Sequence, residues 1–358
     1  MAKIALISDV HLDTRQYGLK ERYEDFLASF IGFGDSVAAR KPNYVVIGGD
    51  LFDAPRPDAR SVKVAQGVVG CIKQRGIGVY GIDGNHDLAN GDWLDVVGAY
   101  NLSEVPLDLY GVSVVGINYR NGRDFISAIQ GMIDSGVKAD ILVAHFALAE
   151  MNGGGTADTG VQELCPLLEK LGVKCVLMGH GHIPDARKWN GILFVNPGST
   201  EMKSSNEPQE KYYFEVDTDT WEATPVRLKT REVVQKEIVD EEALAAFAKD
   251  LEGEFRSGKD SRERPFYQVI VDDTIEDAFK RVSQVIHDTC TIARVVMRSS
   301  KSRDLAPVVD RKEGVATLAS AIEARFPKES QEARLTAGFL HSPEPSAIHL
   351  MVEKFMKS

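Results

Sequence analysis

Five of the eight histidines of this sequence lie in a series of short polar motifs within its first 182 residues. Each motif follows a short apolar run and contains residue types that bind metal ions. The motifs are Asp9-Val10-His11, Gly49-Asp50, Gly84-Asn85-His86-Asp87, His145 and Gly179-His180-Gly181-His182. Carboxylate, amide and imidazole groups in this combination are suitable ligands for a pair of divalent metal ions that hydrolyses phosphoesters. The sequence therefore predicts metal-assisted hydrolysis by residues in the N-terminal part of the chain.

The spacing of these residues suggests how they share two ions. Residues two apart in an extended segment project to the same side of the backbone, so Asp9 with His11, and His180 with His182, can each reach one ion. Asp50 follows two glycines, which let backbone and ions approach closely. Its two carboxylate oxygens are a natural bridge between two cations. We expect one ion to be held by Asp9, His11, Asp50 and His182, and the second by Asp50, Asn85, His145 and His180.

The remaining polar residues of the motifs have other expected roles. The predicted ligands include no thiolate, which disfavours structural zinc and suits manganese, iron or a comparable ion. His86 stands next to the predicted ligand Asn85 and is left over. It is the best candidate to protonate the leaving oxygen or to stabilise negative charge in the transition state. We expect Asp87 to orient its neighbours without binding a metal ion itself.

Other residues near the motifs have two readings. A lone histidine is more often structural than catalytic, but an ordered set of five is hard to explain in that way. The glycine-rich segment 152–156 lacks the Gly-Lys-Ser/Thr ending of a phosphate-binding loop, so we interpret it as a mobile loop. Five basic residues that follow the motifs are candidates for contacts with a phosphate backbone, and solvated surface charge explains each of them equally well: Arg15, Lys20, Arg56, Arg60 and Lys203.

The elements that must position these residues alternate along the chain. Short apolar runs predict strands at 4–7, 44–47, 79–82, 112–116, 141–144, 173–178 and 193–195, and amphipathic stretches predict helices at 22–39, 60–74 and 162–171. Near-continuous hydrophobicity fits strands that helices cover on both faces. The pattern indicates an α/β fold with a β-sheet core flanked by helices. The polar motifs follow strand ends, where functional groups of such sheets gather.

The second part of the chain predicts a smaller domain. Closing strands are expected at 212–216 and 224–228, and a boundary within 232–240. A helix at 241–255, a charged loop at 257–263, a strand at 267–271, a helix at 275–287 and a strand at 292–298 follow. Helical segments at 315–325 and 348–356 end the chain. We therefore divide it into a main domain at 1–231, a small α+β domain at 232–305 and a C-terminal helical tail at 306–358.

Composition limits the cellular compartment and the binding partners that we expect for this protein. No apolar stretch approaches the ~18 residues of a membrane helix, and the run at 4–7 is too short for a signal peptide, so we expect a cytoplasmic protein with no membrane contact. The four cysteines form no CxxC pair and are interpreted as buried free thiols. The net charge of −11 argues against a broad basic surface for nucleic acid, so a nuclease of this composition must rely on metal ions, local basic loops or a partner.

The motifs together resemble the calcineurin-type metallophosphoesterase superfamily, whose pattern is D-x-H, GD, GNHD, a single H and GHxH. Within it, Gly49-Asp50-Leu51-Phe52-Asp53 with Arg56-Pro57 is similar to the SbcD-type (Mre-eleven) nucleases that repair DNA double-strand breaks. Asn196-Pro197-Gly198-Ser199 is shared with the wider superfamily. Arg264-Pro265-Phe266 resembles the start of the capping domain of these nucleases. The resemblance covers residues 1–230 well, the cap moderately and the tail poorly.

This resemblance implies a manganese-dependent nuclease with two metal ions per chain that acts as an exonuclease on duplex DNA and an endonuclease on single strands. It also implies a homodimer that works with an SMC-like ATPase on nucleoid DNA, with the C-terminal helices as candidate contacts to that ATPase. Segments 60–74 and 93–100 are candidates for the dimer contact, although burial in the monomer explains their apolar residues equally well. Asp53 stands where some members carry a catalytic histidine, so His86 is the stronger candidate and Asp53 is assigned a supporting role.

Three other functions remain to be weighed. A dimetal phosphodiesterase for a small nucleotide or a lipid-sugar conjugate would use the same ligands, and the acidic charge favours it mildly. The Arg264-Pro265-Phe266 motif and the cap-like domain favour the nuclease, because a small-molecule enzyme needs no such additions. A non-enzymatic scaffold should have lost some ligands, and none is missing. The segment after Asp50 lacks the GDxxDRG pattern of protein phosphatases.

Overall fold

The structure is a computed structural model that describes residues 2–87, 93–151, 156–256, 258 and 263–298. The first compact unit of the chain ends at Met297. The expected C-terminal helices at 315–325 and 348–356 and residues 152–155 of the glycine-rich segment lie outside the described residues. Within the described part, no helix is both long and apolar enough to cross a membrane.

Strands of the main domain form two sheets of six strands each within the described chain. The first sheet has the order β12-β11-β1-β2-β3-β4, with β1 (Lys3–Ile7), β2 (Tyr44–Ile47), β3 (Gly78–Gly81), β4 (Tyr100–Asn101), β11 (Tyr212–Asp217) and β12 (Glu222–Arg227). The second has the order β5-β6-β7-β8-β10-β9, with β5 (Leu107–Leu109), β6 (Val112–Ile117), β7 (Ile141–His145), β8 (Cys175–Gly179), β9 (Asp185–Trp189) and β10 (Ile192–Asn196). Strands β1 to β4 pair in parallel, as do β6, β7, β8 and β10.

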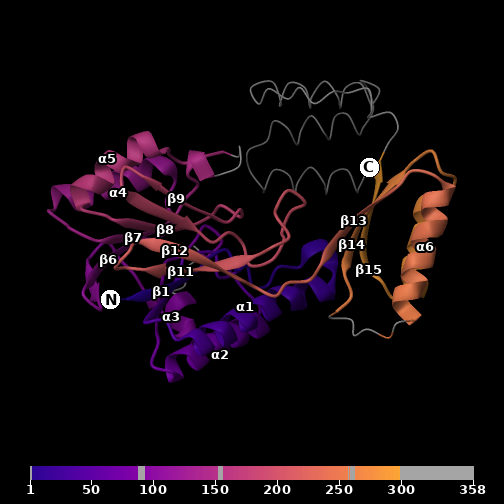
Figure 1. The fold of residues 1–358 in the computed structure, drawn as a ribbon, viewed down its shortest axis with the longest axis horizontal. Coiled ribbons are helices and arrows are strands. Elements are labelled where there is room, and N and C mark those ends of the chain that lie inside the picture. The colour runs from indigo at the N-terminus through magenta and orange to yellow at the C-terminus, as the bar shows by residue number, and fades with distance from the viewer. Residues whose placement is uncertain (1, 88–92, 152–155, 257, 259–262, 299–358) are drawn as a thin grey trace, which may run out of the picture. The chain divides into compact units, whose positions relative to one another are not determined.

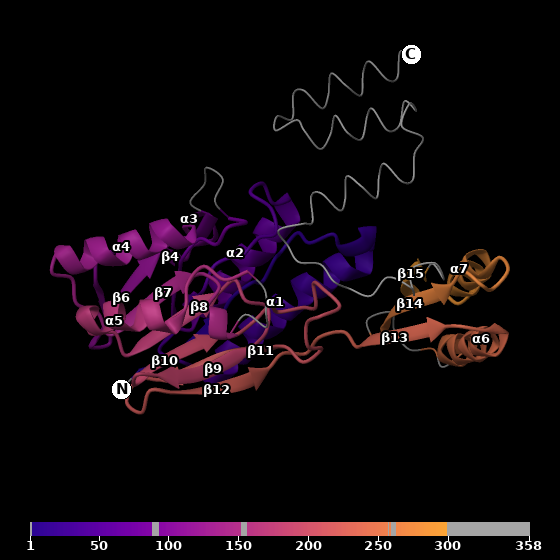
Figure 2. The same cartoon turned by 90° about the horizontal axis from the view of Figure 1, so that it is seen from above.

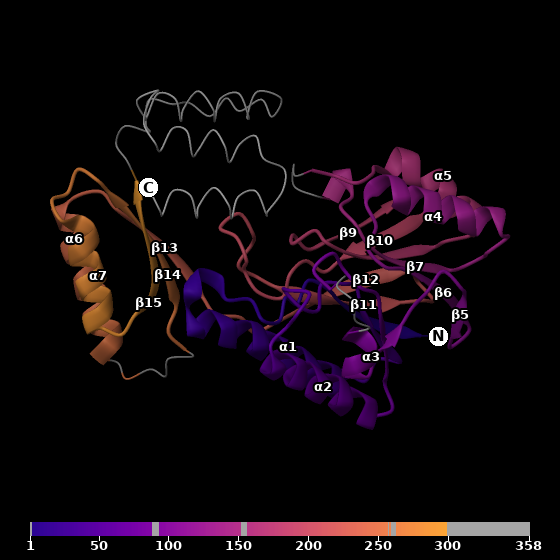
Figure 3. The ribbon, with the colours of Figure 1, turned by 180° about the vertical axis from the view of Figure 1, so that it is seen from behind.

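Helices cover the outer faces of the two sheets. Figures 1 and 3 show α1 (Lys20–Arg40), α2 (Ala59–Gln74) and α3 (Trp93–Val97) on one side of the domain, and α4 (Gly122–Asp134) and α5 (Val161–Leu171) on the other. Short 3-10 helices occur at η1 (Gln16–Gly18) and η2 (Ala149–Met151). The α/β fold with helices flanking a sheet core is confirmed.

The packing between these layers differs from the expectation in one respect. Ile4 and Leu6 of β1 share an apolar core with Ile141 and Val143 of β7. Each sheet therefore packs one face on helices and the other face on the second sheet. The expectation of helices on both faces of the strands is wrong, because a buried face reads as apolar whether a helix or a sheet covers it.

The two sheets bring the polar motifs together. Segments after β1, β2 and β3 carry the first three motifs, and β7 and β8 lead into the last two. Because parallel strands end at the same edge of their sheet, the motifs of each sheet emerge side by side. A parallel bridge between Leu12 and Phe52 extends the pairing of the first two segments beyond their strands.

The expected small domain contains β13 (Val233–Ile238), β14 (Phe266–Asp272), β15 (Ile292–Arg298), α6 (Glu241–Arg256) and α7 (Ala278–Asp288). The segment 232–240, expected to hold a boundary, is largely the strand β13, which pairs in parallel with β14. Figure 2 shows α6 and α7 side by side on one face of this sheet, where Phe247 and Val282 join its core. The division at residue 231 stays a prediction.

The four cysteines are free, and two of them are placed as expected. Cys165 and Cys175 are buried, whereas Cys71 and Cys290 are exposed. The prediction of four buried thiols is therefore wrong for the latter two. Cys71 lies on α2 and Cys290 lies in the turn after α7; the apolar residues near them in sequence, such as Ile72 and Ile292, are buried but leave the thiols exposed.

Candidate metal centre

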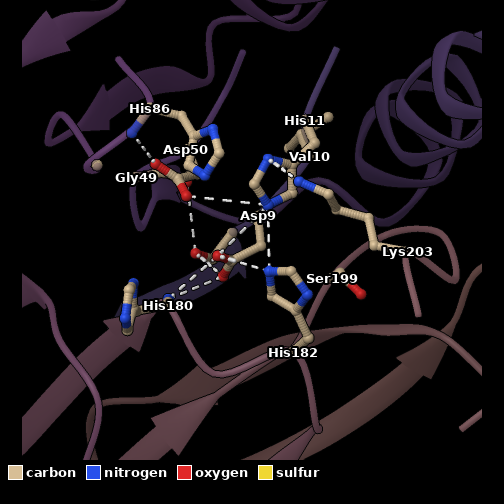
Figure 4. A network of polar contacts seen from close by, with 12 residues as sticks. Asp9, Val10, His11, Gly49, Asp50, His86, His180, His182, Ser199 and Lys203 are labelled. Atoms are coloured by element: carbon tan, nitrogen blue, oxygen red, sulfur yellow. Dashed lines mark hydrogen bonds and ion pairs between the residues drawn. The ribbon is translucent and has the colours of Figure 1, made fainter. Parts of the chain in front are cut away.

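Seven predicted ligands, carried by segments from both sheets, come together at one place in the structure. Figure 4 shows the side chains of Asp9, His11, Asp50 and His182, from three segments of the chain, pointing toward one another, with the backbone amide of His180 joined to Asp9. In the part of the chain that the structure describes, three smaller sets of potential ligand atoms have all their atoms within 4.8 Å of one another. Two of these sets fall among the predicted ligands: Asp9, His11 and His182, and Asp9, Asp50 and His145. The structure thus brings the distant motifs into one cluster.

The first predicted ligand group surrounds the Nε2 atoms of two histidines. Nε2 of His11 lies 3.1 Å from Nε2 of His182. Nε2 of His182 lies 3.6 Å from Oδ1 of Asp9. Nε2 of His11 is 3.9 Å from Asp9 and 3.8 Å from Oδ2 of Asp50. Ligand atoms ~2.1 Å from one ion and at right angles to each other are about 3 Å apart, so these four side chains can close on a single ion with small adjustments.

The second predicted group lies on the other side of Asp50. Nε2 of His145 is 3.4 Å from Oδ2 of Asp50 and 3.1 Å from Oδ1 of Asn85. Nδ1 of His180 is 2.9 Å from the same amide oxygen of Asn85. The Asp50 oxygen that faces His145 also faces His11, so this carboxylate stands between the two groups. Such a position is the one expected of a bridging ligand.

The cluster is suited to cations because the lone pairs of its nitrogen and oxygen atoms face one another. Nδ1 of His145 lies 2.8 Å from the carbonyl oxygen of Gly48, a geometry in which Nδ1 carries the proton and donates it. Nε2 of the neutral ring then presents a lone pair toward the oxygens of Asp50 and Asn85. Burial lowers the pKa of His145, but the Asp50 carboxylate outweighs this and raises it to about 9. The site therefore attracts a positive charge, which a divalent ion supplies as well as a proton does.

Backbone conformation holds the ligands in place. Asp9, His11, Asp50 and His180 have φ angles of 50°, 49°, 50° and 83°, in the left-handed region that non-glycine residues rarely adopt. Each such residue costs on the order of 1–3 kcal/mol, and clusters of them are typical of functional sites. At Gly84, an added Cβ would lie 2.1 Å from Oδ1 of Asp50, so only glycine lets the two segments approach.

Hydrogen bonds from neighbouring residues orient the two carboxylates. Asp9 accepts from the hydroxyl of Ser8 at 2.6 Å and from the backbone amide of His180 at 3.0 Å. Asp50 accepts at Oδ1 from the backbone amide of His86 at 2.9 Å. These bonds occupy one side of each carboxylate and leave Oδ2 of Asp50 facing the histidines.

Asp87 connects two of the motif-bearing segments. Its buried carboxylate accepts from the backbone amides of Leu51 and Gly84 at 3.1 Å and of Phe52 at 2.9 Å. One side chain thereby joins the segment that carries Asp50 to the segment that carries Asn85. This arrangement suits the supporting role that the sequence suggests for Asp87.

His86 lies at the edge of the cluster and is partly exposed. Its Nδ1 is 2.7 Å from the backbone carbonyl of Asp53, and its ring centroid is 5.0 Å from that of His11. With Nδ1 engaged in this way, Nε2 is the ring atom available to a substrate. His86 is therefore placed beside the predicted ligands without being one of them.

Asp53 and Lys203 form an ion pair next to His11. Nζ of Lys203 donates to Oδ1 of Asp53 at 2.6 Å, and Nδ1 of His11 lies 3.2 Å from the same carboxylate. Lys203 therefore differs from the other candidate phosphate contacts, because it lies inside the cluster.

The other four basic candidates lie elsewhere on the surface. Arg15 pairs with Asp58 at 2.7 Å, and Arg60 pairs with Glu24. Lys20 and Arg56 are exposed. The structure therefore brings only Lys203 of the five into contact with the predicted metal ligands.

Two residues near the cluster were not anticipated from the sequence. The carboxylate of Glu207 lies 2.9 Å from Nδ1 of His182. The ring of Tyr119, from the segment after β6, lies 6.1 Å from His145 and 5.9 Å from His180 between centroids. Tyr119 also lines a groove of about 760 Å³ with Arg120, Asn121 and Asp124. The tyrosine follows an apolar strand, as the motifs do, but a lone aromatic residue carries little signal.

Comparison with known proteins supplies the family. A model of the calcineurin-like phosphoesterase family matches residues 2–184, more than half of the chain. The DNA double-strand break repair protein Mre11 of Archaeoglobus fulgidus is 26% identical over 305 residues, which cover 72% of this chain and 66% of that protein. The Mre11 protein of Aeropyrum pernix is 40% identical over 87 residues, 24% of this chain and 21% of that protein. The chain thus spans less than two thirds of the length of the relatives that it matches.

Among solved structures, the phosphoesterase Yfce of E. coli aligns with a TM-score of 0.33 and 14% identity, and covers 63% of this chain and 100% of that one. The family match includes the whole series of motifs from Asp9 to His182. Their side chains converge, and the acceptor atoms among them call for divalent cations. The chain belongs to the calcineurin-like phosphoesterase family and is a metal-dependent phosphoester hydrolase.

Proposed function

We propose that this protein is a nuclease that processes DNA ends in double-strand-break repair. This proposal is supported by two observations together: the set of candidate metal ligands is full, and the similarity to Mre11 extends past the phosphoesterase domain. The Archaeoglobus alignment covers 72% of 358 residues, about 258, which exceeds the 231 residues assigned to that domain. It therefore includes part of the cap-like region, which a hydrolase of small molecules would not need.

In this proposal, Asp9, His11, Asp50 and His182 bind one divalent ion, and Asp50, Asn85, His145 and His180 bind the other. Nitrogen and oxygen ligands without a thiolate suit Mn²⁺. When bound, the two metal ions would supply an activated water and neutralise charge on the phosphate. The protein then orients the scissile phosphodiester beside Asp50. His86, held through its Nδ1 by the Asp53 carbonyl, protonates the departing oxygen through Nε2.

DNA binding by the isolated chain is proposed to be weak. The net charge is −11, and Arg15 and Arg60 already pair with acidic neighbours. Of the five candidates for phosphate contacts, exposed Lys20 and Arg56 remain on the surface, and Lys203 lies within the cluster. We expect affinity to fall steeply with salt and to depend on dimer formation and on an SMC-like ATPase partner in the nucleoid. Tight, salt-insensitive binding by the purified chain would contradict this view.

The decisive experiment is degradation of an end-labelled blunt duplex by the purified protein with Mn²⁺. We expect shortening of the labelled strand and cleavage of single-stranded circles to linear strands, both abolished by chelation and by His86→Ala. His287→Ala is a matched control, because His287 is exposed and far from the motifs in sequence. Turnover of bis-p-nitrophenyl phosphate without cleavage of any DNA would replace the nuclease by a phosphodiesterase for small substrates.

A further inference from the structure

We propose that Glu207 is a positioning residue that fixes the ring of His182 with its Nε2 atom toward the metal centre. The inference rests on the metal ligands of the proposed function and concerns how one of them is held. Glu207 lies outside every motif, in the segment between β10 and β11. Its role follows from its contacts, its burial and the charge beside it.

The carboxylate of Glu207 is held by five donors, and each of its oxygens has a separate task. Oε1 lies 2.9 Å from Nδ1 of His182 and accepts from the backbone amide of Ser204 at 3.1 Å. Oε2 accepts from the hydroxyl of Ser199 at 2.7 Å, the backbone amide of Lys203 at 3.1 Å and the ammonium of Lys211 at 2.7 Å. The side chain therefore has almost no freedom to rotate, and Oε1 stands fixed beside the imidazole.

The charge of Glu207 is secured by a buried cation. The side chain of Lys211 is 1% exposed and that of Glu207 is 5% exposed. The Lys211 ammonium also donates to Ser199 at 2.8 Å. A buried lysine requires an anionic partner within contact distance, and Glu207 is that partner.

An ionised carboxylate beside Nδ1 decides which nitrogen of His182 carries the proton. The neutral ring donates Nδ1–H to Glu207, so Nε2 keeps its lone pair. This lone pair faces Nε2 of His11 at 3.1 Å and Oδ1 of Asp9 at 3.6 Å, the predicted ligands of the first ion. A carboxylate in this position also raises the basicity of the ring, and loss of such a partner typically costs about 10–100-fold in metal affinity.

The buried histidine ligand His145 is held in a different way from His182. His145 engages a neutral carbonyl, that of Gly48, and the backbone there is already fixed by the turn after β2. His182 is more exposed, with 26% of its side chain accessible, and it needs a stronger anchor. Glu207 and Lys211 supply that anchor from outside the loop that carries the histidine.

Three variants test this proposal. Glu207→Met with Lys211→Met removes the carboxylate together with its buried cation, so no unpaired charge is left, and such replacements are often neutral or stabilising. Glu207→Gln with Lys211→Met restores an acceptor for Nδ1–H without the charge. Glu210→Gln is the matched control, because Glu210 is exposed and pairs with Arg227.

Two readouts are independent of catalysis. Ring ¹⁵N chemical shifts of the metal-free protein at alkaline pH report the tautomer of His182, assigned by its loss in His182→Gln. Titration with Mn²⁺, followed by the electron paramagnetic resonance of the free ion, reports affinity and stoichiometry. We expect one tautomer with Nδ1–H in the wild type and in Glu210→Gln. The double methionine variant should show mixed tautomers and bind one of two ions about 10–100-fold more weakly.

The variant with Glu207→Gln and Lys211→Met should keep the Nδ1–H tautomer and lose less Mn²⁺ affinity than the double methionine variant. It serves as the test of Glu207 if the double methionine variant fails to fold. Wild-type affinity for both ions and an unchanged tautomer in the folded double methionine variant would overturn the role of Glu207 alone. If that variant does not fold, wild-type affinity for both ions in the glutamine variant would do so. Failure of the wild type to bind Mn²⁺ would overturn the metal ligands as well. Neither readout involves DNA, so a negative nuclease assay leaves this test intact.

Discussion

The ammonium of Lys203 lies 2.6 Å from Oδ1 of Asp53 and 3.2 Å from Nδ1 of His11. Among the described residues, His11, Asp53 and His86 have atoms close enough to form a third set of metal ligands. A lysine cation already balances the carboxylate in that set. Since a second cation there would be repelled by the first, we infer that Asp53 and His86 serve the substrate side of the centre, whereas His11 binds metal together with Asp9 and His182.

Removal of the Lys203 charge should slow the reaction more than it weakens metal binding. Lys203→Met is expected to lower kcat about 10–100-fold, because a positive charge beside the reacting phosphate stabilises the transition state. Steady-state kinetics on bis-p-nitrophenyl phosphate and on duplex DNA measure the effect, with exposed Lys229 changed to Met as the control. Equal losses in Mn²⁺ affinity and in kcat would show that the lysine acts only by holding His11.

Asp53 is not expected to donate the proton to the leaving group. Burial would raise its pKa, but hydrogen bonds from His11 and Lys203 hold it at about 2. A carboxyl group with a lowered pKa is ionised above that value, so Asp53 has no proton to give near neutrality. Asp53→Asn should therefore reduce the rate without changing the shape of the pH–rate profile between about pH 6 and 9. Loss of the alkaline limb in this variant would instead identify Asp53 as the acid.

Sequence patterns predicted the buried strands because their apolar runs are continuous. Strands β2 and β15 begin and end where the sequence suggests. Strand β9 was missed because its residues Asp185–Trp189 are polar and partly exposed at a sheet edge. Helix α4 was also missed, although Asn121 caps it and Phe125, Ile129 and Met132 form a buried stripe. That stripe is a usable helix signal, whereas the edge strand becomes visible only through its pairing with β10.

The site was predictable to the extent that its residues stand in motifs. Asp9 and Asp50 are far apart in the chain, and they come together because the parallel strands before them end at one edge of the same sheet. His145 reaches them from the second sheet, which packs against the first. Glu207 was out of reach because it lies in a polar segment with no periodicity, and its partners Lys211 and His182 are identified only by the tertiary fold. Supporting residues of this kind need three-dimensional structure.

Asp87 is expected to support stability and metal binding together. Asn in its place keeps the shape but offers one acceptor oxygen, and its amide group would face a backbone amide of Leu51, Phe52 or Gly84. A buried amide without a partner costs about 1–3 kcal/mol. Thermal unfolding and Mn²⁺ titration of Asp87→Asn should both show a loss, whereas Asp134→Asn on the exposed end of α4 should show neither. An unchanged melting temperature would exclude the proposed link between the two segments.

Metal ions should stabilise the folded protein measurably. The cluster places the carboxylates of Asp9 and Asp50 among histidine nitrogens, and an ion that binds only the folded state adds about 2.7 kcal/mol at a concentration of 100 times its Kd. The melting temperature should rise with added Mn²⁺ and fall again with chelator. Asp50→Asn should abolish most of the rise, because this carboxylate faces both groups. A rise of the wild-type size in Asp50→Asn would show that the stabilising ions bind elsewhere.

Tyr119 offers a way to separate a nucleic-acid substrate from a small one. Its half-buried ring stands beside His145 and His180 and forms part of the wall of the adjoining groove. If a base next to the scissile phosphate stacks there, Tyr119→Ala should cost about 1–3 kcal/mol, a fall of roughly 5–150-fold in kcat/KM on DNA, and Tyr119→Phe should cost little. Turnover of bis-p-nitrophenyl phosphate should stay nearly unchanged in both variants, because that substrate has no base to stack. Equal losses of kcat/KM on the two substrates would show that Tyr119 supports the neighbouring histidines and does not recognise the substrate.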